Sequence, residues 1–289
     1  MHSLLYGLIA ALTWGLHDFC VRHLSQRLAP APMLLGSLLA GGFVLAVVIA
    51  LSGMWVPMSA RIAVYALASG AFYALACFGL YKAFAIGPVR LVAPICGAYP
   101  MLSFALAAWA GQPIALGQWF ATFAVVGGIA FVAHQPGETS DNTARGTAIA
   151  WAILGAIGFA LTFELGQTAV QAAVQTEGHT GAELPITFLS RLAAIVIVGA
   201  WVLFARLPIT PLRPYVPVLA LMGVLDVTAL GLVLAAGGLA NPEFASVAAS
   251  LFGLVTILLA WRFLGERMVG AQWGGVVLVF AGIGWLAAT

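Results

Sequence analysis

Four ionisable side chains fall inside long apolar stretches of this sequence: Asp18, Glu164, Arg191 and Asp226. A charged side chain at the centre of a membrane helix costs about 2.5 to 3.5 kcal/mol on insertion scales, so such residues normally face protein or a water-filled cavity. A carboxyl group placed there can bind and release a proton or a cation. These residues are therefore the first candidates for functional chemistry.

Glu164 has the most suggestive surroundings of the four. Gln167, Thr168 and Gln171 follow it at i+3, i+4 and i+7, positions that share one face of a helix. We expect this face to point away from lipid, and Glu164 to bind a proton or a cationic ligand at mid-membrane. The alternative is that Glu164 only hydrogen-bonds a neighbouring helix or pairs with Arg191, in which case its role is structural.

The two aspartates occupy less informative positions. Asp226 is surrounded by Gly223, Val224 and Leu225, which favours a structural contact between helices. Asp18 lies in the last turns of the first apolar stretch, where an interfacial position and a cavity position fit equally well. It shares a helical face with Trp14 and His17.

Aromatic and small polar side chains form further stripes at helical spacing, such as Tyr73, Cys77 and Tyr81 on one face of the expected helix 62–86. A stripe of small residues either lines a cavity or packs closely against another helix. The candidate binding or pathway residues are Trp14, His17, Asp18, Tyr73, Tyr81, Cys96, Tyr99, Ser103, Phe163, Glu164, Gln167, Asp226, Ser246 and Ser250.

No catalytic, cofactor or metal motif accompanies these residues. His17 and His23 lie on different helical faces, and neither HExxH nor GxSxG occurs. The three cysteines form no CxxC pair. A net charge of +2 without a basic run makes nucleic acid an unsuitable partner. We therefore expect no enzyme activity, no cofactor and no bound metal.

The elements that must position the candidates are membrane-spanning helices. Hydrophobic residues make up 63% of the chain and charged residues only 7%, against about 25% charged in soluble domains. A span needs roughly 20 apolar residues. The fold class is therefore all-α, with ten transmembrane helices in a lipid bilayer, expected at 3–23, 32–51, 62–86, 89–109, 116–134, 146–171, 184–204, 215–237, 243–263 and 270–288.

Some spans carry additional signals. Pro94 and Pro100 interrupt the fourth window, where proline removes backbone donors and favours either a kinked gating helix or a static bend. Small residues recur along the fifth and tenth windows. They could pack helices within one protomer or between two protomers of a homodimer.

The sequence also contains an internal duplication. A shift of 154 residues places Gly87-Pro88 on Asn241-Pro242, and Gln118-Trp119 on Gln272-Trp273. A shift of 149 places Trp14 on Phe163. The expected domains are a five-helix repeat at 1–134, a polar linker at 135–145 and a second repeat at 146–289. Because each repeat has an odd number of spans, the two repeats must enter the membrane from opposite sides.

The basic residues follow the same plan. Most of them flank the loops after odd-numbered spans, as with Arg22 and Arg27 in the first half and Arg206 and Arg213 in the second. Positively charged loops are normally cytoplasmic. We therefore expect those loops in the cytoplasm and both chain termini outside.

Each repeat ends in a Gly-Glu or Gly-Gln turn followed by a helix of the form Gln-Trp-x-x-x-x-x-x-x-Gly, at Gly111-Gln112 and at Gly265-Glu266. In these features the whole chain resembles the EamA family of the drug/metabolite transporter superfamily. The resemblance implies a secondary transporter, an exporter, that moves a small amphipathic organic solute such as an amino acid by alternating access, with a central pathway. It also implies cytoplasmic termini, which opposes the charge bias.

Two other kinds of protein remain open at this stage, an intramembrane enzyme and a membrane assembly partner that transports nothing. Proton coupling is a further expectation, attached to Glu164. The near absence of lysine beside ten arginines, with abundant Ala and Gly, indicates a GC-rich bacterial gene and hence a multi-pass protein of the inner membrane.

Overall fold

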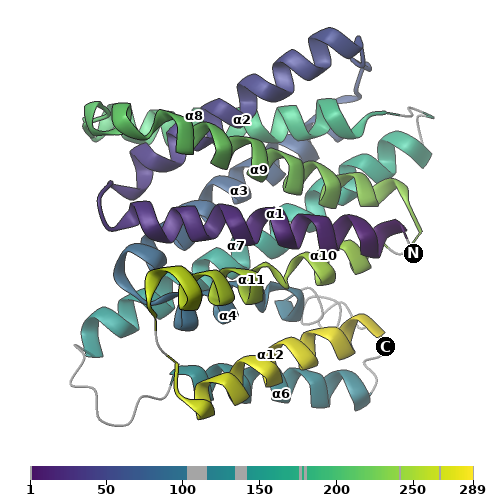
Figure 1. Cartoon of the computed structure of the whole chain (residues 1–289). Coiled ribbons are helices and arrows are strands. Elements are labelled where there is room, and N and C mark those ends of the chain that lie inside the picture. Colours follow the sequence, from purple (N-terminus) through teal and green to yellow (C-terminus); the bar gives the residue numbers. More distant parts are fainter. Residues whose placement is uncertain are drawn as a thin grey trace.

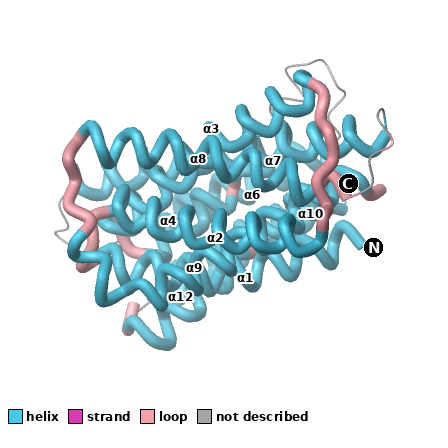
Figure 2. The backbone as a smooth tube through the Cα atoms, turned by 90° about the horizontal axis from the view of Figure 1, so that it is seen from above, coloured by secondary structure: helices cyan, strands magenta, loops and turns pink. Residues whose placement is uncertain are grey.

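The computed structural model describes residues 2–102, 116–133, 142–175, 178, 181–240, 242–266 and 268–288. Their regular structure is entirely helical (Figures 1 and 2). The α-helices are α1 (His2–Ser25), α2 (Pro30–Ser52), α3 (Ala60–Ile86), α4 (Val89–Gly97), α6 (Leu116–Ala133), α7 (Asn142–Gln175), α8 (Glu183–Phe204), α9 (Val216–Ala235), α10 (Glu243–Ala249), α11 (Phe252–Leu259) and α12 (Gly270–Ala288). Short helical turns are η1 (Thr210–Tyr215), η2 (Ala236–Gly238) and η3 (Ala260–Leu264).

Length and composition identify seven of these stretches as capable of crossing a membrane: His2–Ser25, Pro30–Ser52, Ala60–Ile86, Thr143–Gln175, Glu183–Phe204, Thr210–Gly238 and Phe244–Leu264. Val89–Leu102 and Gly270–Trp285 are shorter apolar helical segments. The prediction of an all-helical membrane fold is confirmed. The described residues do not establish the predicted count of ten spans by these criteria.

Each main contact between two helices has a counterpart in which every helix is replaced by the equivalent helix of the other half of the chain. α3 packs on α7 as α9 packs on α1, and α3 packs on α8 as α9 packs on α2. α4 contacts α7, as α10 and α11 contact α1. The remaining large contacts, α2 with α8, α4 with α11 and α6 with α12, each join equivalent helices. Two units related by a two-fold axis produce this pattern.

Helix α3 lies at the centre of the bundle and is approached closely by its neighbours (Figure 1). A Cβ atom on Gly70 would lie 2.0 Å from the carbonyl oxygen of Ser190 in α8. A Cβ atom on Gly158 of α7 would lie 2.8 Å from Ala76 of α3. Glycine is therefore required at both positions for the backbones to approach this closely.

The two helices that cross near the centre are both interrupted. α4 contains Pro94 and ends at Gly97, and helical turns resume at Tyr99. The break between α10 and α11, at Ser250 and Leu251, contains no proline and is not apparent from the sequence. The interruption expected from proline is thus present in the first repeat, and an equivalent one occurs in the second.

Glu266, which follows η3, connects several segments of the chain. Its carboxylate accepts a hydrogen bond from the Arg22 side chain of α1 at 2.9 Å and another from the backbone N–H of Val89 at 2.9 Å. Arg22 in turn donates to the carbonyl oxygen of Phe84 at 2.5 Å. The Gly-Glu motif therefore caps the start of α4 and joins it to the ends of α1 and α3.

Candidate functional site

A small central cavity lies between α1, α3, α7, α9 and α11. In this conformation it has room for about one water molecule, which is too little for an organic solute. Its lining combines aromatic rings with two carboxyl groups: Trp14, His17, Asp18, Tyr73, Cys77, Leu80, Phe159, Phe163, Asp226 and Phe252.

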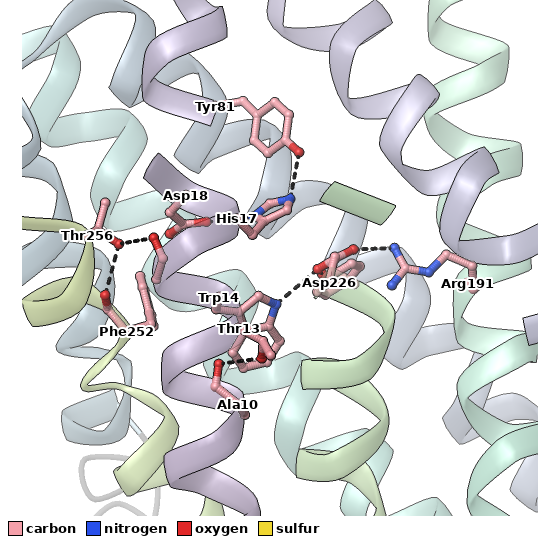
Figure 3. A network of polar contacts seen from close by, with 12 residues as sticks. Ala10, Thr13, Trp14, His17, Asp18, Tyr81, Arg191, Asp226, Phe252 and Thr256 are labelled. Atoms are coloured by element: carbon pink, nitrogen blue, oxygen red, sulfur yellow. Dashed lines mark hydrogen bonds and ion pairs between the residues drawn. The ribbon is translucent and has the colours of Figure 1, made fainter. Parts of the chain in front are cut away.

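Asp226 accepts hydrogen bonds on both carboxylate oxygens (Figure 3). Trp14 Nε1 donates to Oδ1 at 3.0 Å, and the Tyr73 hydroxyl donates to the same oxygen. Arg191 Nη1 donates to Oδ2 at 2.6 Å, and its guanidinium lies 5.2 Å from the centre of the Tyr73 ring. Asp226 is thus fully paired, and its charge is balanced by a guanidinium that is itself completely buried.

Asp18 has a very different environment. His17 Nδ1 lies 2.8 Å from Asp18 Oδ1, and His17 Nε2 lies 3.1 Å from the Tyr81 hydroxyl (Figure 3). The other carboxylate oxygen, Asp18 Oδ2, is buried and has no hydrogen-bond partner among the described residues. The cavity therefore contains one carboxyl group with partners on both oxygens and one with a partner on a single oxygen.

The aromatic wall of the cavity extends beyond the residues expected from sequence. Trp14 and Phe163, which occupy equivalent positions in the two repeats, have ring centroids 5.5 Å apart. Phe159 stacks on Phe163 at 5.9 Å, and Phe252 contacts both Trp14 and Phe159. Phe159 could have been found because it precedes Phe163 by one helical turn, whereas nothing in the sequence distinguishes Phe252.

A second polar cluster joins α4, α7 and α10. The Gln167 side-chain amide donates to Ser246 Oγ at 3.1 Å and to the carbonyl oxygen of Val233 at 2.9 Å. The Tyr99 hydroxyl donates to the carbonyl oxygen of Ser246, and the Tyr99 ring contacts Phe163 at 5.0 Å. This cluster links the aromatic wall of the cavity, through Phe163 and Tyr99, to α10.

The remaining candidates do not join the cavity. The Cys96 thiol contacts the carbonyl oxygen of Ala152 at 3.4 Å, and Ser250 Oγ bonds the carbonyl oxygen of Val247 within its own turn. Ser103 lies outside the described residues.

The expectation for the face of Glu164 is wrong for Glu164 itself, although Gln167 of the same predicted face does contact neighbouring helices. Glu164 and Gln171 are exposed on the outside of α7, on the same side as the exposed Ile153 and Ile157. Arg191 pairs with Asp226 and not with Glu164. The rotation of α7 follows from its packing. Gly158 lies against the backbone of Ala76, and Gly166 lies against the side chains of Leu234 and Ser69. In this orientation Phe159 and Phe163 point inward while Glu164 points outward.

This arrangement, an all-helical bundle of long apolar helices around a small aromatic and acidic cavity, is that of a multi-pass membrane protein. The EamA-like transporter family matches residues 1–133 and 146–288, one match for each repeat, so the chain belongs to that family. This match confirms the resemblance seen in the repeat motifs. Members of the family are transporters.

A comparison with solved structures supports the fold. A crystal structure of another protein matches with a TM-score of 0.68, covering 98% of this chain and 97% of that chain at 13% sequence identity. No curated protein matches the sequence. The similar structure supports the arrangement of the helices and carries no information about the solute.

Proposed function

We propose that this protein is a secondary transporter that moves a small amphipathic organic solute, outward across a bacterial inner membrane, by alternating exposure of the central cavity. The observation that carries the proposal is the small central cavity, which is lined by helices from both halves of the chain and combines aromatic and acidic side chains. Ligand sites in membrane carriers lie at the interface of repeats near the bilayer midplane. The arginine-rich, lysine-poor composition supports the bacterial origin.

The proposed architecture is ten spans in two inverted five-helix repeats. Three observations support it: the contacts that are unchanged by exchange of the halves, the separate family match to each half, and the position of both termini at one end of the bundle (Figure 1). Termini at the same end require an even number of crossings. Two copies of a unit with an odd number of spans fulfil this condition only if they are inverted.

Alternating access predicts that filling the cavity stops transport. Cys77 lines the cavity from α3, and Cys77→Trp places an indole in a space that holds about one water molecule. Ile157→Trp places the same side chain on the exposed face of α7 and serves as the control. In proteoliposomes preloaded with solute, we expect counterflow in the wild type and in Ile157→Trp, and loss of at least about tenfold in Cys77→Trp.

The same measurement separates the rival classes of function. A channel conducts without exchanging labelled for unlabelled solute, and an enzyme changes the solute chemically. An assembly partner does neither. Amino acids, aromatic amines and neutral aromatic alcohols form the first panel of solutes, and an absence of counterflow with all amphipathic compounds would reject the proposed function.

A further inference from the structure

The charges in the core of the bundle do not balance. Among the described residues, the fully enclosed charged side chains are Asp18, Asp226 and Arg191. Arg191 balances Asp226, with which it forms a direct ion pair. An ionised Asp18 would leave one net negative charge in a low-dielectric interior, which is expensive unless a positive charge joins it.

The groups that face Asp18 identify where that positive charge can come from. α1 contributes His17, and α3 contributes the neutral groups Tyr73, Cys77 and Tyr81. α9 contributes Asp226, whose negative charge opposes a second ionised carboxyl nearby. Arg191 of α8 pairs with Asp226 through Nη1, and its buried Nε and Nη2 have no partner among the described residues. The described lining of the cavity contains neither lysine nor arginine. The missing charge is therefore either a proton on the Asp18–His17 pair or a charge on the ligand.

The rest of the cavity suits an organic cation. Trp14, Phe159, Phe163 and Phe252 line the same cavity as Asp18 with aromatic rings. Aromatic faces attract ammonium groups, and the attraction strengthens when water is excluded. A carboxylate of a zwitterionic ligand would find no free basic side chain in this lining, because Arg191 lies behind Asp226 and outside the cavity.

We propose that Asp18 is the cation site of the transporter and that the solute is an amphipathic organic monocation. When no solute is bound, the Asp18–His17 pair holds one proton, which hydrogen-bonds within the pair. When the ammonium group of the solute binds at Asp18 Oδ2, that proton leaves to water, so the charge of the core is the same before and after. This inference rests on the proposed transport function and narrows its solute from amphipathic metabolites in general to amines.

Three aromatic compounds of similar size test the assignment in purified, folded protein. Phenethylamine carries an ammonium group, phenylalanine adds a carboxylate to it, and 2-phenylethanol carries no charge. Binding is followed by calorimetry, and proton release by a pH dye in weakly buffered solution. We expect phenethylamine to bind at least about tenfold more tightly than the other two, and to release close to one proton for each molecule bound.

Variants locate the exchange at Asp18. Asp18→Asn removes the charge at nearly constant volume and should lose both proton release and the preference for phenethylamine. Asp18→Glu retains a carboxyl group and should keep both, although with altered affinity. Glu164→Gln makes the same chemical change on the exposed face of α7 and should behave as the wild type.

Each contrary result has a definite meaning. Phenethylamine binding without proton release, or full preference retained in Asp18→Asn, overturns the proposal. Tighter binding of phenylalanine than of phenethylamine also overturns it, because it would mean that Arg191 receives the ligand carboxylate. Counterflow of 2-phenylethanol or phenylalanine without recognition of phenethylamine would leave the transport function standing and reject only the cation site.

Discussion

The Arg191–Asp226 ion pair is completely enclosed, which makes the two side chains depend on each other. Removing one partner of a buried pair leaves the other charge uncompensated and costs about 3 to 5 kcal/mol, whereas replacing both partners by apolar residues is often nearly neutral. We expect Arg191→Met and Asp226→Asn each to lower the unfolding temperature in detergent strongly, and the double variant Arg191→Met/Asp226→Leu to recover much of the loss. A double variant as unstable as the sum of two single losses would contradict this.

The sequence predicts some residues of the site and misses others. Ionisable residues within spans are recognisable because they interrupt apolar stretches, and the shared face of Trp14, His17 and Asp18 follows from helical spacing. The partner of Arg191 could not be found in this way, because Glu164 and Asp226 are equally plausible until the rotation of α7 is known. That rotation depends on glycine contacts with α3 and α9.

At the scale of the helix, close packing of α3 against α8 gives a sharp prediction. Gly70→Ala places a methyl group about 2.0 Å from the backbone oxygen of Ser190, so the helices must separate. Overpacking of this kind costs about 1 to 3 kcal/mol. Gly231→Ala in α9 meets no atom within 4 Å and gains helix propensity of up to about 1 kcal/mol. Thermal unfolding should therefore show loss in the first variant and none in the second.

The Glu266 cap on α4 gives a second prediction at this scale. Glu266→Ala removes both the hydrogen bond to the Val89 N–H and the pair with Arg22, and we expect a loss of about 1 to 2 kcal/mol. Glu266→Gln keeps an acceptor for Val89 but loses the charge, so it should be less destabilised. Equal unfolding temperatures for the two variants would show that the charge, and not the cap, dominates.

Helix breaks illustrate what a sequence pattern can and cannot predict. Proline marks the interruption of the fourth span because it removes a backbone donor. The break at Ser250 and Leu251 has no such marker. This break lies opposite Gly97 of α4, since a Cβ atom on Gly97 would be 3.0 Å from the backbone oxygen of Ser250. The break therefore occurs where the two helices cross.

For the whole molecule, the charge distribution predicts orientation. The ends of α1, α3 and η3 carry Arg22, Lys82 and Arg262 at the end of the bundle opposite the termini (Figure 1). By the positive-inside rule this end is cytoplasmic and both termini are outside, against the expectation from family resemblance. A C-terminal alkaline phosphatase fusion should be active, and a fluorescent C-terminal fusion dark. The reverse pattern would place the termini in the cytoplasm.

The helical class, the duplication and the family followed from apolar windows and from motifs that recur at a constant shift. The number of spans is less accessible to such reasoning, since interrupted helices such as α4 and α10 are individually too short to cross a bilayer. The central site required contacts between helices far apart in the chain, and these contacts are not encoded in any local pattern.

The outward carboxyl group of Glu164 also affects how the protein fits its bilayer. α7 has 34 residues and is about 51 Å long, well beyond a hydrocarbon core of about 30 Å. Phe163 lines the cavity, so its neighbour Glu164 lies at the depth of the cavity while facing outward. Local thinning of the bilayer around this side of α7 would bring headgroup water to the carboxylate at a modest elastic cost.

Hydrophobic thickness should therefore influence stability through this one side chain. We expect the wild type to unfold at higher temperature in bilayers of shorter acyl chains than in those of longer chains. Glu164→Gln should flatten that dependence, since an amide is less costly to leave in hydrocarbon than a carboxylate. If the unfolding temperature of Glu164→Gln depended equally steeply on acyl-chain length, the preference for thin bilayers would come from the overall length of the helices. The lipid composition of the host membrane would then act on the whole bundle.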